Sequence, residues 1–151
     1  QAQRDTQTDV FIRHLILAHT LNRRVFIHNL IATAAIAAAV KTAGFTQGGI
    51  VHAFSGSVEE ARILVKLGFK IGIGSLLLNP NAKKVRVALQ ALNDTDFVLE
   101  TDSPFMLGHE TNTPANIRRI AEIAAELRGI PLAQLAEITE QNVDSLLHTS
   151  P

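Results

Sequence analysis

Short apolar runs alternate along this chain with longer segments whose apolar residues recur every three or four positions. The short runs are rich in Val, Ile and Phe, and they span residues 23–28, 48–54, 69–75 and 96–102. Runs of this kind are typical of strands that are buried on both faces, as in a parallel sheet. The longer segments between them have the periodicity of amphipathic helices. The repeating order of strand and helix predicts parallel strands with right-handed crossovers.

Local signals mark where several of the predicted helices begin and end. Ser57 and Glu60 have the spacing of a capping box ahead of an apolar stripe. Gly44 and Gly68 each follow a helical segment at a place suited to a left-handed cap, and a later helix is expected to end near Gly129. These signals separate the helices clearly, and no linker or low-complexity tract divides the chain. We therefore expect residues 1–151 to form a single α/β domain.

The number of strand–helix units limits the architecture. A closed (β/α)8 barrel has eight units and about 250 residues, whereas this chain has four units in 151 residues. Four units form either a small open α/β sheet or half of a barrel. The chain begins with Gln1, and its one methionine is Met106. A start without methionine agrees with missing upstream sequence, although a processed chain would look the same.

Composition excludes several classes of protein. The formal net charge is zero, so nucleic-acid binding would depend on a local basic patch rather than on overall attraction. There is no cysteine, which rules out disulfides and thiolate metal sites and agrees with a cytoplasmic location. The most apolar run, residues 30–40, is too short to span a bilayer. We expect no membrane partner.

Three of the four predicted strands end on a side chain that can bind a metal ion. These residues are His28, His52 and Asp102. Sites in parallel α/β proteins lie at the carboxyl ends of the strands, so the three side chains should project from one edge of the sheet. Imidazole nitrogen and carboxylate oxygen suit divalent zinc, manganese, magnesium or iron. Taken singly, each His could be a hydrogen-bonded structural residue and the Asp a turn-former; their agreement in position favours a metal site.

Glu100 is a candidate for supporting this site. Side chains alternate along a strand, so Glu100 would lie on the same side as Asp102, one layer below it. There it could orient a metal ligand through a hydrogen bond. The competing interpretation is a buried carboxylate that is satisfied by backbone groups or another side chain.

The segment from Ser55 to Ser57 is a candidate phosphate-binding turn. Gly56 allows the backbone to bend, and the free N–H groups of a helix that begins at Ser57 attract anions. Ser-Gly is also a common turn signal before helices that bind no ligand. Three basic residues near the start of a later helix could contact a polyanion, but the pattern favours a solvated helix face. They are Lys83, Lys84 and Arg86.

The remaining histidines show no arrangement that indicates a site. His14 and His19 are five residues apart and do not share a helix face. His109 and His148 have no clear partners in the sequence.

Several segments of the chain resemble the TatD family of metal-dependent deoxyribonucleases. The specific pieces are "VHAFSG" and "LETDSP", and weaker ones, including "VFIH", "LGFKIGIGS" and "NTPANI", follow the family in order from about Phe11 to Leu147. The resemblance implies a (β/α)8 barrel that holds one or more divalent metal ions and hydrolyses phosphodiester bonds in DNA. It places His28, His52 and Asp102 at ligand positions of the family. It also implies that Asp102 takes a proton from the attacking water.

The resemblance covers only the C-terminal half of such a barrel. The family's other ligands are a His-x-His pair on the first strand and a Glu at the end of the fourth. This sequence contains no His-x-His, and no strand is predicted before its first helix. We therefore expect parallel β/α units that form the C-terminal half of a (β/α)8 TIM barrel, with zinc, magnesium or manganese as cofactor and DNA or a small phosphoester as substrate.

Two other functions remain open at this point. The first is a catalytically incomplete half-barrel that lacks the N-terminal ligands. Its exposed apolar strand edges would favour a homodimer that rebuilds an eight-stranded barrel. The second is a related hydrolase that acts on amide or lactone bonds. The phosphate-friendly turn from Ser55 to Ser57 argues against this last function.

Overall fold

The computed structural model describes residues 2–108 and 110–147, with side chains from residue 5 onward. His109 and His148, which sequence reasoning left without partners, lie outside the described residues. The strands are β1 (Val25–His28), β2 (Gly49–His52), β3 (Phe69–Ile73) and β4 (Phe97–Leu99). The α-helices are α1 (Ala2–Thr20), α2 (Thr33–Ala43), α3 (Val58–Lys66), α4 (Lys83–Ala91), α5 (Ile117–Arg128) and α6 (Leu132–Leu147). Two short 3₁₀ helices, η1 (Ser75–Leu78) and η2 (Pro114–Asn116), precede α4 and α5.

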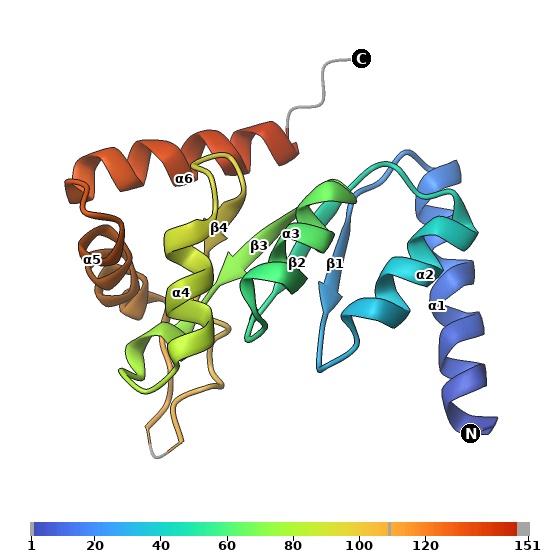
Figure 1. Ribbon diagram of the computed structural model, residues 1–151, viewed down its shortest axis with the longest axis horizontal. Coiled ribbons are helices and arrows are strands. Elements are labelled where there is room, and N and C mark those ends of the chain that lie inside the picture. The colour runs from blue at the N-terminus through green and yellow to red at the C-terminus, as the bar shows by residue number, and fades with distance from the viewer. Residues whose placement is uncertain (1, 109, 148–151) are drawn as a thin grey trace.

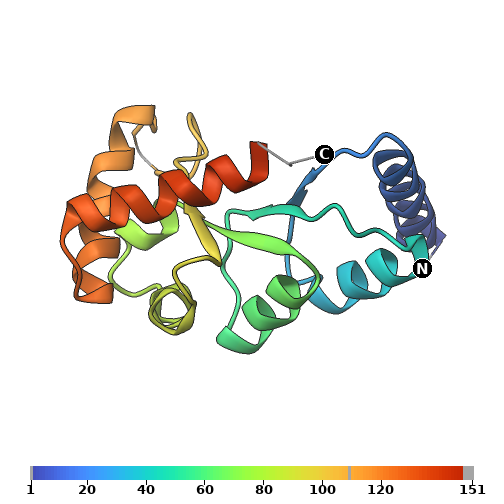
Figure 2. The same cartoon turned by 90° about the horizontal axis from the view of Figure 1, so that it is seen from above.

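The four strands form one sheet in the order β1-β2-β3-β4, and every neighbouring pair is parallel. The predicted α/β class and parallel pairing are therefore confirmed. Ile27, Val51, Ile71 and Phe97 point to the helical side of the sheet and are almost completely buried. Figure 2 shows α2, α3 and α4 side by side along that face. Burial of these apolar side chains between sheet and helices supplies the core of the fold.

The helices follow one another in a row, each packed against the next, from α1 at one end of the sheet to α5 and α6 at the other (Figure 1). Helix α6 also reaches the amino-terminal ends of the strands. Asn142 of α6 donates hydrogen bonds to the carbonyl oxygens of Asp94 (2.6 Å) and Phe97 (2.7 Å). Arg24, just before β1, donates to the carbonyl oxygen of Ser145 at 3.0 Å. These bonds fix α6 to the sheet.

Most of the expected helix signals are present, but the C-cap of α3 is Leu67, and Gly68 follows it with a φ of 89°. Ser57 and Glu60 form a complete capping box at the start of α3. Gly44 and Gly129 cap α2 and α5 in the left-handed conformation, with φ of 59° and 66°. Because a residue without Cβ adopts this conformation without a steric penalty, the chain can turn sharply back toward the next strand.

The strands are shorter than the sequence predicts, and β4 differs most. It was expected to run to Asp102, but it ends at Leu99. The backbone amide of Glu100 still donates to the carbonyl oxygen of Ile73 at 3.1 Å, after which the chain leaves the sheet. Asp102 has a left-handed backbone with φ of 56°. The strict alternation used to place Glu100 and Asp102 on one side therefore does not extend to Asp102.

Among the described residues, no helix combines the length and the apolar character that a membrane span requires.

Candidate active site

The carboxyl ends of β1 and β2 bring two of the predicted ligands into contact. His28 and His52 are directly opposite each other in the register of the two strands. Nδ1 of His28 lies 3.3 Å from Nε2 of His52, and the ring centroids are 5.0 Å apart. His28 is exposed and His52 is half-buried. Only one of the two facing nitrogens can carry a hydrogen in such a contact. One hydrogen or one cation can therefore bridge the two rings.

Glu100 lies behind His52, at the position from which it can orient that ring. Its Oε1 is 4.0 Å from Nδ1 of His52, the ring nitrogen that points away from His28. The same oxygen accepts a hydrogen bond of 2.5 Å from the backbone amide of Ala53. Burial raises the pKa of Glu100 above its usual value, and the nearby charge of Asp102 adds to this effect. The Ala53 amide and His52 act in the opposite direction and favour the carboxylate.

Gly72 in β3 and Gly74, directly after β3, make room for this arrangement. Glu100 follows β4, whereas His52 ends β2, so the carboxylate has to cross β3 to reach the histidine. At Gly72 a Cβ would lie 2.8 Å from Oε2 of Glu100 and 2.9 Å from the Cα of His52. At Gly74 the nearest atom would be Cγ of Glu100 at 3.4 Å. The "GIG" pattern of β3 is the sequence signal for this crossing, and sequence reasoning did not use it.

Asp102 lies in the loop that follows β4, and its carboxylate is not part of the histidine pair. It is close enough to Glu100 to raise the pKa of that residue. Within residues 2–108 and 110–147, no three His, Cys, Asp or Glu side chains are grouped closely enough to hold one metal ion. The structure thus brings together His28, His52 and Glu100 pairwise, and it leaves Asp102 outside that contact.

A buried amide that sequence reasoning did not single out holds the Asp102 loop. The side-chain nitrogen of Asn112 contacts the carbonyl oxygens of Thr101 and Phe105 at 2.5 and 2.8 Å. It also lies 2.9 Å from Oγ of Ser75, which itself donates to the Thr101 carbonyl at 2.7 Å. Asn112 and Ser75 are both buried. These contacts tie the residues on either side of Asp102 to the start of η1.

The three residues of the predicted phosphate-binding turn, Ser55 to Ser57, lie in two different environments. Ser57 and Glu60 satisfy each other's backbone amides at 2.9 and 3.3 Å, so a carboxylate already occupies the start of α3. Gly56 lies against the same carboxylate, 2.8 Å from its Oε2 at the position of a Cβ. Ser55 is exposed and instead lines a hollow of about 310 Å³ together with Lys83 and Lys84. The turn therefore offers its first serine, next to two lysines, rather than a free helix start.

The other basic and histidine residues have structural contacts. Arg86 donates to the carbonyl oxygen of Leu77 at 3.0 Å, so it does not join the two lysines. Nδ1 of His14 is 2.8 Å from the carbonyl oxygen of Val10. Nδ1 of His19 is 2.9 Å from the side-chain oxygen of Gln47. Neither of these two histidines is near the pair at the strand ends.

The fold and the histidines at the strand ends together define the class of this protein. It is a parallel β/α protein of the TIM-barrel type, with imidazole and carboxylate groups clustered at the carboxyl ends of its strands. The family model described as "TatD related DNase" matches residues 1–148. The chain belongs to the TatD family.

Relatives and solved structures agree with this assignment. "Uncharacterized metal-dependent hydrolase YabD" of Bacillus subtilis is 32% identical over 97% of this chain and 59% of that protein. "3'-5' ssDNA/RNA exonuclease TatD" of a Rahnella species is 31% identical, again over 97% of this chain and 59% of the relative. The crystal structure of the TatD homologue YJJV from Escherichia coli superposes with a TM-score of 0.80 and 30% identity, covering 91% of this chain and 54% of that one. The chain spans little more than half the length of these proteins, which confirms the expected half of a TIM barrel.

Proposed function

We propose that this chain carries part of the active site of a metal-dependent hydrolase that cleaves phosphodiester bonds in DNA. The observation that carries the proposal is the contact of 3.3 Å between His28 and His52 at the ends of two neighbouring parallel strands, with Glu100 behind His52. Relatives named as a metal-dependent hydrolase and as an exonuclease for single-stranded DNA and RNA support both the reaction and the substrate.

The histidine pair has the chemistry of a metal site. Two nitrogens bound to one tetrahedral zinc ion at 2.0–2.1 Å are about 3.3 Å apart, which is the separation found here. Both rings present a nitrogen lone pair to the same space once they are neutral. His28 and His52 would therefore hold the divalent ion, whether zinc, magnesium or manganese, and Asp102 is the proposed third ligand.

Each remaining residue has a distinct proposed role. A bound divalent ion would supply Lewis acidity toward the phosphoryl oxygen and the attacking water. Asp102 accepts the proton of that water, and Glu100 keeps the His52 ring in position. Ser55, with Lys83 and Lys84, contacts the phosphates that flank the bond to be cleaved. Gly56 and Ser57 contribute by shaping this turn, since the Glu60 carboxylate already accepts a hydrogen bond from the Ser57 amide and lies against Gly56.

The first test measures metal in the purified chain. We expect a bound divalent ion by inductively coupled plasma mass spectrometry in the wild type, and its loss in His52→Ala. The matched control is His19→Ala, because His19 is a surface histidine with a hydrogen bond to Gln47. Equal metal content in both variants would contradict the assignment of His52.

The second test measures hydrolysis. Asp102→Asn should lower kcat on single-stranded DNA by about 10²–10⁴-fold, the usual contribution of a positioned general base. Metal content is measured on the same sample, which separates loss of the base from loss of a ligand. Full activity in Asp102→Asn would exclude Asp102 from both roles.

A second candidate function is a half-barrel that does not catalyse by itself. It is favoured by the finding that no three potential ligands form one group within the described part of the chain. Two imidazoles alone should hold an ion weakly. Absence of bound metal and of hydrolysis, in a chain that is folded by circular dichroism, would favour this function over the first.

A further inference from the structure

We propose that Thr33 is a positioning residue for the histidine pair: its hydroxyl group ties the end of β1, where His28 lies, to the turn that follows His52. The tie is a chain of hydrogen bonds that runs from Asn29 through Thr33 to Glu60. The inference rests on the proposed function, in which His28 and His52 hold the divalent ion. It adds a residue outside the pair, which acts through the backbone at the two strand ends.

The first part of the hydrogen-bond chain closes the loop after β1. Asn29 directly follows His28 and is buried. The side-chain oxygen of Asn29 accepts a hydrogen bond of 2.9 Å from the backbone amide of Ala32. Because the oxygen faces that amide, the NH2 group faces the other way, where it donates to Oγ1 of Thr33 at 2.8 Å. Both polar ends of the Asn29 side chain are therefore bound, and they hold the loop in place.

The second part of the chain reaches the start of α3. The Thr33 hydroxyl group has one hydrogen, which it donates to Oε1 of Glu60 at 3.0 Å. The other carboxylate oxygen of Glu60 accepts a hydrogen bond of 2.9 Å from the backbone amide of Ser57. An ionised carboxylate only accepts hydrogen bonds. Thr33 therefore donates in one direction only, and removal of its hydroxyl group would interrupt the chain in the middle.

The two strand ends benefit from such a tie because each is followed by a strained residue. The register between β1 and β2 ends with the pair His28 and His52. Ala53, directly after His52, has a φ of 50°, and Ile31, in the loop after β1, has a φ of 54°. A left-handed backbone is unfavourable for a residue with Cβ, most of all for a β-branched one, and it persists where surrounding contacts hold it. The hydrogen-bond chain connects the two segments that contain these residues.

Packing alone does not explain a threonine at this position. The other buried residues of α2 are Ile36, Ala39 and Val40, which are all apolar. Thr33 is only 5% exposed, and a valine of nearly the same shape would fill the site without a hydroxyl group. A buried hydroxyl group is costly unless its hydrogen bonds are made. The two that Thr33 makes lead to the two strand ends, so its hydroxyl group serves their relative position.

The first measurement is the affinity for zinc, by isothermal titration calorimetry on the purified protein. In Thr33→Val the NH2 group of Asn29 and one oxygen of Glu60 lose their partner, so the two strand ends are no longer tied. We expect zinc to bind about tenfold more weakly, the lower end of what residues behind metal ligands contribute. Thr33→Ser keeps the hydroxyl group and should restore the affinity of the wild type.

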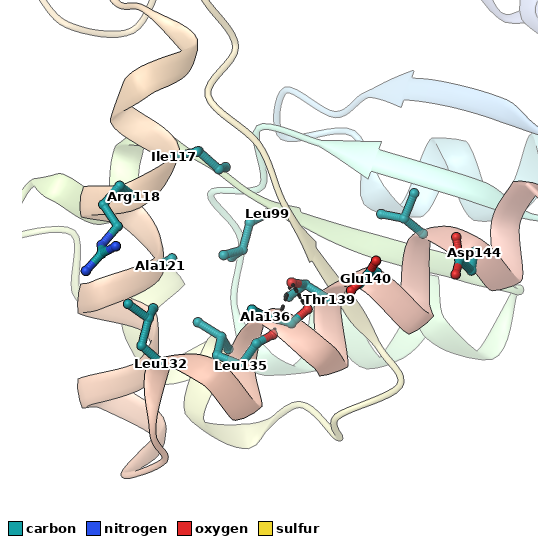
Figure 3. Close-up of a pocket in the computed structure, with 11 residues that line it drawn as sticks. Leu99, Ile117, Arg118, Ala121, Leu132, Leu135, Ala136, Thr139, Glu140 and Asp144 are labelled. Atoms are coloured by element: carbon teal, nitrogen blue, oxygen red, sulfur yellow. Dashed lines mark hydrogen bonds between the residues drawn. The ribbon is translucent and has the colours of Figure 1, made fainter.

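Thr139→Val is the matched control. Figure 3 shows Thr139 on α6, beside the hollow between β4, α5 and α6, and β4 lies at the other end of the sheet from β1. Its hydroxyl group donates within its own helix, to the carbonyl oxygen of Leu135 at 3.0 Å. The substitution therefore removes a threonine hydroxyl group without touching the loops after β1 and β2. The affinity for zinc should stay at the value of the wild type.

The second measurement needs no metal. The ring centroids of His28 and His52 are 5.0 Å apart, near enough for nuclear Overhauser effects between their ring hydrogens in the metal-free protein. We expect these effects in the wild type, in Thr33→Ser and in Thr139→Val, and their loss in Thr33→Val. A substitution that only lowers global stability leaves the rings in place in the folded molecules, so it does not change this signal.

The two measurements separate this inference from the proposed function. If the wild type binds no zinc, the proposed ligand role of the histidines fails, and the ring signals still decide whether Thr33 positions them. The inference is overturned by ring signals that are absent from the wild type or that persist in Thr33→Val. It is also overturned if zinc binds the wild type and Thr33→Val equally, or if Thr33→Ser fails to restore what Thr33→Val loses.

A second variant covers the case in which Thr33→Val does not fold, as judged by circular dichroism. Glu60→Gln leaves Thr33 in place and replaces the carboxylate by an amide, which has a single oxygen to accept from both Thr33 and Ser57. The chain is then interrupted at its next member. The same loss of ring signals and the same weakening of zinc binding are expected, and an unchanged Glu60→Gln would overturn the inference.

Discussion

The cluster of His28, His52 and Glu100 depends on the absence of a side chain at Gly72. Glu100 reaches His52 only because Gly72 leaves the intervening strand bare at the point of crossing. The carboxylate thereby becomes mostly buried, and this partial loss of water is the main reason that the pKa of Glu100 is raised. The backbone amide of Ala53 compensates in part by donating a hydrogen bond. A glycine inside a strand is usually a weakness, and here it makes the site possible.

Replacing this glycine should disturb both the site and the stability of the fold. In Gly72→Ala the new methyl group would meet Oε2 of Glu100 at 2.8 Å and the Cα of His52 at 2.9 Å. Since the second of these is backbone, we expect a loss of about 1–3 kcal/mol in the free energy of unfolding, measured by urea denaturation. Gly74→Ala is the control, because its methyl group meets the nearest atom at 3.4 Å, an ordinary contact. Equal losses in the two variants would show that close packing at Gly72 is not the cause.

Sequence alone could locate the histidines but not the geometry around them. His28 and His52 follow short apolar runs, and the carboxyl ends of parallel strands meet at one edge, so their contact was predictable. Glu100 was placed near the site by alternation along β4, but its route over Gly72 depends on packing between three strands. Asp102 was assigned to the end of a strand, whereas its backbone turns into the left-handed region after β4 has ended. The local sequence does not indicate at which residue a strand stops pairing with its neighbour in the sheet.

At the scale of elements, the starts of α3 and α4 differ in what they offer to an anion. The capping box of α3 places the Glu60 carboxylate at the helix start. Helix α4 instead begins with Lys83 and Lys84, both exposed and both lining the hollow that contains Ser55. The sequence pattern alone had favoured a solvated helix face for these lysines. Their position beside Ser55 makes α4 the better candidate for contact with a DNA backbone.

Removing both lysines should weaken DNA binding in a salt-dependent way. Each phosphate contact contributes about 0.7 to the slope of log affinity against log salt on single strands. We expect the double variant Lys83→Ala/Lys84→Ala to lower that slope by about 1.4, measured by fluorescence anisotropy with a labelled oligonucleotide. Lys41→Ala/Lys66→Ala removes the same charge from positions near the ends of α2 and α3. If this control has the same effect, overall charge rather than the start of α4 governs binding.

Lys70 of β3 is partly buried beside α6, so its protonation should be linked to the stability of the fold. Nζ of Lys70 donates to the carbonyl oxygen of Thr95 at 2.7 Å and lies 3.5 Å from the side-chain oxygen of Asn142 on α6. Burial lowers the pKa of Lys70, and Arg24 adds to this effect while Asp96 opposes it. Between this lowered pKa and the ordinary value of about 10.4, the unfolded chain binds more protons than the folded one. Stability from this residue should therefore rise with pH across that window.

The measurement compares the wild type with Lys70→Met by chemical denaturation at several pH values from about 7 to 10.5, a range that reaches the ordinary lysine pKa. The difference in unfolding free energy should shift in favour of the wild type as the pH rises. Lys41→Met, at an exposed position on α2, is the control and should give a constant difference. A constant difference for Lys70→Met as well would show that its burial does not affect protonation.

At the scale of the whole molecule, the predictable part of the fold is the part that local periodicity determines. Four β/α units and their parallel order could be inferred from the chain, and the match to just over half of the length of TatD proteins follows from the same count. The exposure of Val10, Leu17 and Leu21 on α1 was not predicted, because the same helix carries core residues such as Leu15 on another face. Which apolar residues of a helix stay exposed depends on the packing of the neighbouring helices, and local periodicity does not determine that packing.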